Sequence, residues 1–274
     1  MTDADTSPDA EVLYAVADHV ATLTLNRPGR MNTISRTMLN ELTALLVRAD
    51  EDPDVRAVIL TGTGRAFCAG LDLSEATRAP APGEGGISNS ATLATNLDLR
   101  NTPPTVLFNM GKPTICALNG SAAGYGMDTA LGCDIRIMAA GAKMAAAFTR
   151  RGIVPESGGT WFLPRLIGWS KAAELIFTGR TLTAEQSLEM GLVSSVVDDA
   201  DLAGAARSLA LEIAANAPLA VQASKKMMRM GLDETFNDHV HHVFLQLLPL
   251  MRSKDAAEGM RAFMEKRPAE FTGR

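Results

Sequence analysis

Residues 113 to 139 read PTICALNGSAAGYGMDTALGCDIRIMA, and this stretch determines the fold class. Residues 113–118 form a short, almost continuous apolar run, which is typical of a buried strand. A glycine-bearing turn follows, then a segment at 124–132 that is expected to be helical, and then a second strand at 134–139. A strand, a helix and another strand in direct succession indicate an α/β core.

The same alternation extends toward the N-terminus. Residues 20–27 (VATLTLNR) alternate apolar and polar side chains, which predicts a strand paired with residues 12–16. Ser35 is a candidate N-cap for a helix over the following residues, RTMLNELTALLVRAD, whose apolar side chains recur at helical spacing. Residues 55–61 (VRAVILT) then form another apolar run of the kind found in buried parallel strands.

The pattern becomes almost wholly helical beyond Gly158. We expect helices at residues 160–166, 171–177, 184–190, 202–214, 219–230 and from 234 onward, with one strand at 192–197. The chain is therefore expected to have three parts, which are a loose acidic tail (residues 1–10), an α/β core (residues 11–215) and a helical C-terminal segment (residues 216–274). Residues 78–90 are rich in proline, glycine, alanine and serine, which predicts a surface loop.

The composition is that of a globular protein with a substantial core, since 46% of the 274 residues are apolar and 21% are charged. The net charge of −5 argues against nucleic acid or an anionic membrane surface as the main partner. Three cysteines in apolar surroundings indicate a reduced protein rather than a disulfide framework. The N-terminus does not resemble a signal peptide and no apolar run has the length of a bilayer span, so we expect a cytoplasmic protein without membrane contact.

Two glycine-bearing segments each follow a predicted strand, AFCAGLDL at 66–73 and NGSAAGYGMD at 119–128. A strand that ends in a glycine turn and enters a helix exposes unpaired backbone N–H groups. If the two segments converge, their N–H groups can hold one oxygen from two sides, which is an oxyanion hole. The alternative is that the glycines only permit tight turns. Neither segment is a dinucleotide-binding fingerprint or a P-loop.

These segments, together with GIVPESGGTWFLPRLIG, resemble in order and spacing the signature segments of the crotonase superfamily, the enoyl-CoA hydratases and isomerases. RPGRMNTIS near the start and GMRAFMEKRPAEF near the end resemble further segments of that family. The likeness covers the chain from about Val20 onward. It implies an α/β fold built as a spiral of repeated ββα units, with a helical C-terminal segment that forms trimers or hexamers.

The resemblance also implies roles for individual residues. The residues after Gly70 and Gly124 match the two oxyanion donors, so Leu71 and Tyr125 should supply the backbone N–H groups. The positions that match CoA contacts are Arg27, Met31, Ala66, Ala69 and Asp72. Phe263 and Lys266 match positions that reach the CoA of a neighbouring subunit.

The acid–base positions determine which reaction is expected. Hydratases of the family use two glutamates, whose positions are occupied here by Asp128 and Phe148. Because a phenylalanine cannot hold or activate water, ordinary hydration is disfavoured. Glu156 matches the base of the family's Δ3,Δ2-enoyl-CoA isomerases. Its place beside Pro155 at a glycine-rich helix start suits a base, since an apolar site raises a carboxyl pKa. The alternative is that Glu156 only caps the helix.

The sequence thus predicts an enzyme that moves a double bond in an enoyl-CoA thioester of fatty-acid metabolism through an enolate. CoA arrives as part of the substrate, and neither a metal nor a redox cofactor is expected. One alternative is hydration of 2-enoyl-CoA, as in beta-oxidation, with Asp128 and Glu156 as the acid pair. The other is a catalytically inactive acyl-CoA-binding protein. His239, His241 and His242 lie near one another, but helix residues exposed to solvent explain them better than a metal site.

Overall fold

The computed structural model describes residues 3–4, 7, 9–72, 74 and 102–274, and two sheets organise these residues. The larger sheet has seven strands in the order β1-β2-β3-β4-β6-β8-β11. Its strands are β1 (Asp3–Ala4), β2 (Val12–Ala17), β3 (Val20–Leu25), β4 (Ala57–Gly62), β6 (Thr114–Leu118), β8 (Ile135–Ala139) and β11 (Ser195–Val197). The strands from β3 to β11 pair in parallel, whereas β1 and β2 are antiparallel additions at one edge. Part of the tail expected at residues 1–10 therefore pairs with the sheet through β1.

The smaller sheet has the order β10-β9-β7-β5. Its strands are β5 (Ala66–Cys68), β7 (Ser121–Ala123), β9 (Lys143–Ala145) and β10 (Thr181–Thr183). Strands β5, β7 and β9 each follow a strand of the larger sheet, namely β4, β6 and β8. This repetition confirms the expected α/β fold of ββα units. The three-residue strands themselves were not predicted, because they are too short to show an alternating pattern.

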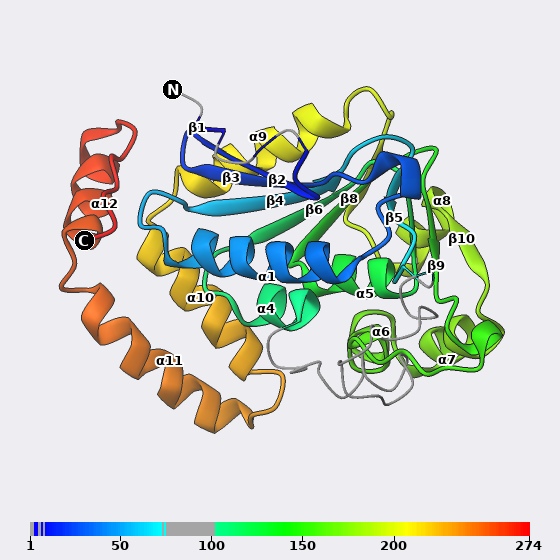
Figure 1. Cartoon of the computed structure of the whole chain (residues 1–274). Coiled ribbons are helices and arrows are strands. Elements are labelled where there is room, and N and C mark those ends of the chain that lie inside the picture. The colour runs from blue at the N-terminus through cyan, green and yellow to red at the C-terminus, as the bar shows by residue number, and fades with distance from the viewer. Residues whose placement is uncertain (1–2, 5–6, 8, 73, 75–101) are drawn as a thin grey trace, which may run out of the picture.

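Helices cover both faces of the larger sheet (Figure 1). They are α1 (Arg36–Glu51), α4 (Pro103–Asn109), α5 (Tyr125–Gly132), α6 (Gly159–Ile167), α7 (Trp169–Thr178), α8 (Ala184–Met190), α9 (Leu202–Ala214), α10 (Pro218–Met230), α11 (Phe236–Leu250) and α12 (Lys254–Glu265), with 3-10 turns η1 (Pro28–Arg30) and η3 (Thr149–Arg151). Helix α9 packs on one face, and α1, α4 and α5 lie on the other. The Ser35 cap is confirmed, since its Oγ accepts the N–H of Met38 at 2.9 Å.

The core is densest where the predicted apolar runs meet. Strand β6 is buried at all five positions, and every residue of α5 is buried. A helix that is buried all round cannot shift without disturbing its neighbours. The N-terminus of α5 is therefore a firmly fixed point in the molecule.

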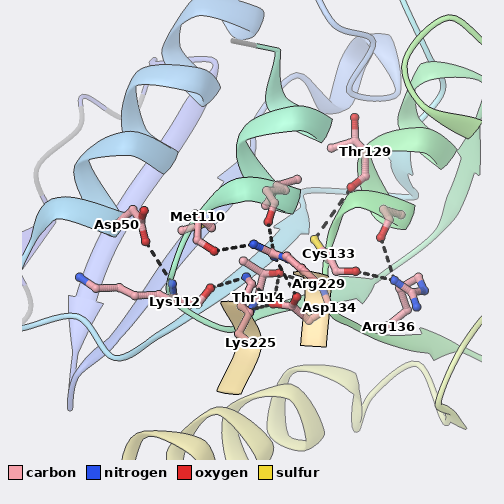
Figure 2. Close-up of polar contacts among 12 residues, drawn as sticks. Asp50, Met110, Lys112, Thr114, Thr129, Cys133, Asp134, Arg136, Lys225 and Arg229 are labelled. Carbon is pink, nitrogen blue, oxygen red and sulfur yellow. Dashed lines mark hydrogen bonds and ion pairs between the residues drawn. The ribbon is translucent and has the colours of Figure 1, made fainter. Parts of the chain in front are cut away.

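Two basic side chains attach helix α10 to the core (Figure 2). Lys225 and Arg229 reach from α10 to the two carboxylate oxygens of Asp134, at 2.6 and 3.2 Å. Arg229 also donates to the carbonyl of Met110 at 2.9 Å, and Lys225 donates to the carbonyl of Lys112 at 2.6 Å. These contacts fix α10 to the start of β8 and to the loop before β6.

Helices α11 and α12 extend from α10 along the edge of the molecule that lies opposite α6 and α7 (Figure 1). Helix α11 has no buried residue, although much of its surface is apolar. The loop predicted at residues 78–90 lies outside the described residues. Within the described ranges, no helix is both long enough and apolar enough to cross a bilayer.

Candidate active site

Two asparagines order the loops around the glycine turns. Asn32 is fully buried, and its side chain accepts the N–H of Arg27 at 2.8 Å while donating to the carbonyl of Ala66 at 2.8 Å. Asn119, just after β6, accepts the N–H of Gly62 at 3.0 Å. These amides tie three loops together at the ends of the parallel strands. The sequence pattern did not identify them, because asparagines are common in loops and only their burial distinguishes these two.

Arg27, which matches a CoA contact of the family, directs its guanidinium into the protein. Its nitrogens meet the Glu11 carboxylate at 3.2 Å, the Thr33 carbonyl at 2.7 Å and the Asp72 carboxylate at 3.1 Å. The Ser74 hydroxyl, and more weakly Arg27, lower the pKa of Asp72. Arg27 therefore has little bonding capacity left for a phosphate, and its evident role is to brace this region.

The other expected CoA contacts gather beside Arg27. The N–H of Ala69 donates to the carbonyl of Met31 at 3.1 Å, and the Met31 side chain remains 41% exposed. Ala66 begins β5 directly after the loop that Asn32 holds. The structure thus brings Arg27, Met31, Ala66, Ala69 and Asp72 into one region, whereas contact with CoA itself stays a prediction.

Leu71 presents the first of the two expected backbone donors. The carbonyl of Gly70 accepts the N–H of Ile34 at 2.8 Å, and the N–H of Asp72 donates to the carbonyl of Ile34 at 2.9 Å. Because Leu71 lies between these two bonds in a parallel bridge, its own N–H points to the opposite side. No acceptor within the described part of the chain bonds that N–H.

Tyr125 presents the second donor, at the first position of α5. The N–H groups of a first helical turn have no partner within the helix. A Cβ added to Gly70 would lie 3.8 Å from the Tyr125 nitrogen, so the two glycine turns are in direct contact. Gly126 makes this approach possible, because a Cβ there would lie 2.3 Å from the carbonyl oxygen of Cys68. This contact brings the Tyr125 N–H close to the Gly70–Leu71 turn, the arrangement that an oxyanion hole requires, whereas the binding of an oxyanion stays a prediction.

Phe148 and Tyr125 are buried aromatic side chains that form an apolar wall at the Gly124 turn. Phe148 is 4% exposed, and two of its ring carbons lie 3.9 Å from the place of a Cβ on Gly124. The Tyr125 ring is also buried, and burial raises the pKa of its phenol, so it stays protonated. Water has little access to this wall, which suits an apolar acyl group.

Two carboxyl groups lie near the start of α6. Glu156 follows the buried Pro155 and remains exposed, yet the surrounding protein partly desolvates it and raises its pKa above the usual 4.5. Asp128, on α5, is 1% exposed, and burial raises its pKa to about 7. The charge of Glu156 adds to that rise. The Asp128 carboxylate accepts the N–H of Gly159 in the first turn of α6 at 3.0 Å, so Asp128 rather than Glu156 caps this N–H.

Other candidates lie away from this point. Phe263 is 83% exposed on α12, a helix that lies across the molecule from α6 (Figure 1), and Lys266 directly follows that helix. His239 and His242 both bond to the Glu234 carboxylate, at 3.1 and 2.9 Å. Among the described residues no group of three or more His, Cys, Asp or Glu is arranged to hold a metal ion.

An apolar cleft of about 830 Å³ lies between α6, α10 and the start of β8. Phe108, Trp161 and Phe162 line it, and their rings pack edge to face at 5.0 to 5.6 Å. Leu71, Tyr125 and Glu156 are not among its lining residues. The cleft is therefore separate from the residues that are candidates for the acid–base chemistry.

Comparison with known proteins gives a consistent result. A family model described as enoyl-CoA hydratase/isomerase matches residues 16–274. The 1,2-epoxyphenylacetyl-CoA isomerase of Escherichia coli is 37% identical over 263 residues, covering 96% of this chain and 98% of that protein. The (E)-benzylidenesuccinyl-CoA hydratase of Thauera aromatica is 38% identical over 264 residues, covering 96% of this chain and 99% of the relative.

Solved structures agree with the sequence relatives. The crystal structure of an enoyl-CoA hydratase from Bacillus anthracis superposes with a TM-score of 0.89 at 34% identity, over 96% of this chain and 100% of that one. Identity of this degree over nearly the whole length concerns the complete fold rather than an isolated motif. The chain is therefore an enzyme that belongs to the enoyl-CoA hydratase/isomerase family.

Proposed function

We propose that the enzyme converts a 3-enoyl-CoA into the conjugated 2-enoyl-CoA, with Glu156 as the base. The observation that carries the proposal is that the Glu156 carboxyl lies close enough to buried Tyr125, whose N–H is one of the two proposed donors, for its charge to act on that residue. The raised pKa of Glu156 suits proton removal, and buried Phe148 stands beside Gly124 without any group that could activate water. One of the relatives is named as an isomerase that acts on another CoA thioester, 1,2-epoxyphenylacetyl-CoA.

The proposed reaction needs only proton movement and charge stabilisation. Glu156 removes a proton from C2 of the thioester, and the electron pair moves into the thioester carbonyl to form a dienolate. The N–H groups of Leu71 and Tyr125 bond the enolate oxygen. The proton then returns at C4, which leaves the double bond between C2 and C3. Loss of one such donor typically costs about 3–4 kcal/mol of transition-state stabilisation, so the donors and the base are of similar importance.

Hydration of 2-enoyl-CoA is the second candidate. The name of the Thauera relative and the nearness of Asp128 to Glu156 favour it. However, Asp128 is almost completely buried, and one of its oxygens already accepts hydrogen bonds from Ser157 and Gly159. A carboxylate that is engaged in this way is poorly placed to hold a reacting water, so we rank hydration second.

We further propose that Arg30 and Arg65 bind the phosphate groups of CoA. Both side chains are exposed. They lie on loops that touch, since a Cβ on Gly64 would lie 3.0 Å from the Cβ of Pro28. Guanidinium groups bind phosphates in a bidentate manner, and the inward direction of Arg27 leaves this task to its neighbours.

Self-association is the last element of the proposal. Helices α11 and α12 and the turn between them expose Phe236, Phe244, Met251, Met260, Phe263 and Met264. At the opposite end of the molecule, Ile153, Val154, Trp169 and Phe177 are exposed around a groove of about 450 Å³. Two different apolar surfaces at opposite ends favour a head-to-tail contact that closes into a ring, and a trimer is the assembly we propose.

The reaction is tested by incubating the purified enzyme separately with 3-enoyl-CoA and 2-enoyl-CoA of several chain lengths. Mass spectrometry separates isomerisation, which leaves the mass unchanged, from hydration, which adds one water. Ultraviolet absorbance follows the conjugated product. Rapid formation of 2-enoyl-CoA with little water addition is expected, whereas fast hydration without isomerisation would reverse the ranking.

A further inference from the structure

The carboxylate of Asp128 has a specific set of partners. One of its oxygens, Oδ2, accepts the hydroxyl of Ser157 at 2.7 Å and the backbone N–H of Gly159 at 3.0 Å. Asp128 lies on the rigid helix α5 and is 1% exposed. Ser157 is buried as well, with 7% of its surface exposed. A single buried oxygen therefore holds both ends of the turn at residues 157–159.

This turn is shaped to receive the carboxylate. A Cβ on Gly159 would lie 2.4 Å from Oδ1 of Asp128, so only glycine permits the approach. Gly158 has a φ of +114°, a conformation that other residues rarely adopt. Helix α6 begins here with Gly158 as N-cap, which has no side chain to satisfy the free N–H groups of the first turn. Asp128 supplies that capping bond from another helix.

Glu156 immediately precedes the turn at residues 157–159, and the two hydrogen bonds from this turn to Asp128 are called the clamp below. Its own side chain is exposed, so packing alone holds it only weakly. The path of its backbone is fixed by buried Pro155 on one side and by Ser157 on the other. We propose that Asp128 is a positioning residue that directs Glu156 at the substrate by holding the 157–159 turn. The proposal rests on the function proposed above, because it requires Glu156 to be the base.

The geometry makes this role distinguishable from direct acid–base catalysis. Both hydrogen bonds need only an acceptor at Oδ2, and the side-chain oxygen of asparagine is such an acceptor. A proton-transferring residue, by contrast, needs a group that can ionise. Burial raises the pKa of Asp128 to about 7, so a neutral side chain is already accommodated at this position. Asparagine should therefore preserve the clamp and abolish any proton transfer.

The test compares Asp128→Asn, Asp128→Ala, Ser157→Ala and Glu156→Gln with the parent enzyme. The first readout is exchange of the C2 proton of a saturated acyl-CoA in heavy water, which reports the direction of Glu156 whatever step follows. The second is kcat and KM for 3-enoyl-CoA, with a melting curve for each variant. Ser187→Ala is the matched control, since Ser187 is a fully buried serine on α8 whose hydroxyl donates to the carbonyl of Thr183, the last residue of β10.

We expect Asp128→Asn to exchange within about tenfold of the parent, and Asp128→Ala to lose about 10²-fold in kcat with little change in KM. Ser157→Ala should fall between them, and Ser187→Ala should match the parent. Exchange in Asp128→Asn as slow as in Glu156→Gln would overturn the positioning role, as would Asp128→Ala at the parental rate. If the parent enzyme exchanged the C2 proton but did not isomerise 3-enoyl-CoA, the proposed reaction would be wrong. The role of Asp128 would still be decided by the exchange rates of the variants. Absence of exchange in the parent would overturn both.

Discussion

Replacing Gly126 with alanine adds one methyl group, which should push apart the two backbone donors, the N–H groups of Leu71 and Tyr125. The new Cβ would lie 2.3 Å from the carbonyl oxygen of Cys68, where ordinary contact begins at 3.4 Å. Helix α5 and strand β5 must therefore move apart by about 1 Å. Tyr125 directly precedes Gly126, and Leu71 follows three residues after Cys68, so the shift falls on both N–H groups.

A misplacement of about 1 Å in a catalytic group can lower a rate by about 10²-fold, and we expect that loss in kcat for isomerisation of 3-enoyl-CoA. Overpacking of a close contact should also lower the free energy of unfolding by about 1–3 kcal/mol. Stopped-flow absorbance gives the first quantity and chemical denaturation gives the second. Raman or infrared spectra of a bound acyl-CoA report the polarisation of its thioester carbonyl, which should weaken if the donors move.

Gly204→Ala is the matched control for this prediction. Gly204 lies on the exposed side of α9, and a Cβ there would have nothing within 4 Å. Alanine is favoured over glycine in a helix by about 1 kcal/mol, so this variant should be slightly more stable and equally active. If Gly126→Ala retained the kcat and the carbonyl spectrum of the parent, Leu71 and Tyr125 could not be the donors as described.

Three further predictions follow from the same geometry. The folded protein raises the pKa of Glu156, and the base must be ionised, so kcat/KM should fall as the pH decreases through a value above 4.5, in the parent and in Asp128→Asn alike. A pH profile in which kcat/KM falls only below pH 4.5 would contradict this. Hydration of 2-enoyl-CoA should be at least about 10²-fold slower than isomerisation, since buried Phe148 offers no group for a water; comparable rates by mass spectrometry would show that another residue activates it. Replacing exposed Phe263 and Met264 with serine should lower the assembly mass in light scattering and weaken CoA binding, whereas an unchanged trimer would place the contact elsewhere.

Most of the larger sheet could be predicted from the sequence because its strands carry strong local signals, whereas the two-residue strand β1 carries none. Strand β6 is continuously apolar and buried, and β3 alternates as a half-buried strand should. The C-terminal helices were likewise predictable from their spacing. Helix α4 was not, because it begins with two prolines, Pro103 and Pro104, and spans only seven residues.

The candidate site was predictable only in part. The glycine turns carry a recognisable spacing, so Leu71 and Tyr125 could be proposed from the amino-acid sequence alone. The partners of Asp128 could not, because Ser157 and Gly159 are distant in sequence and only the fold brings them to that carboxylate. Arg27 is a further example of what the sequence does not reveal. Its match to a CoA contact of the family stays a prediction, whereas no local pattern predicts that its guanidinium pairs with Glu11 and Asp72.

The proposed isomerisation depends on one carboxylate, so the most direct measurement is single-turnover conversion of 3-enoyl-CoA by Glu156→Gln. The amide keeps the size of the side chain but cannot accept the C2 proton. Glu185→Gln, at an exposed position in the first turn of α8, is the control. If Glu156 is the base, its variant should bind CoA as the parent does and convert substrate about 10²–10⁴-fold more slowly, while the control is unaffected. Conversion by Glu156→Gln within a few-fold of the parent rate would remove Glu156 from the mechanism.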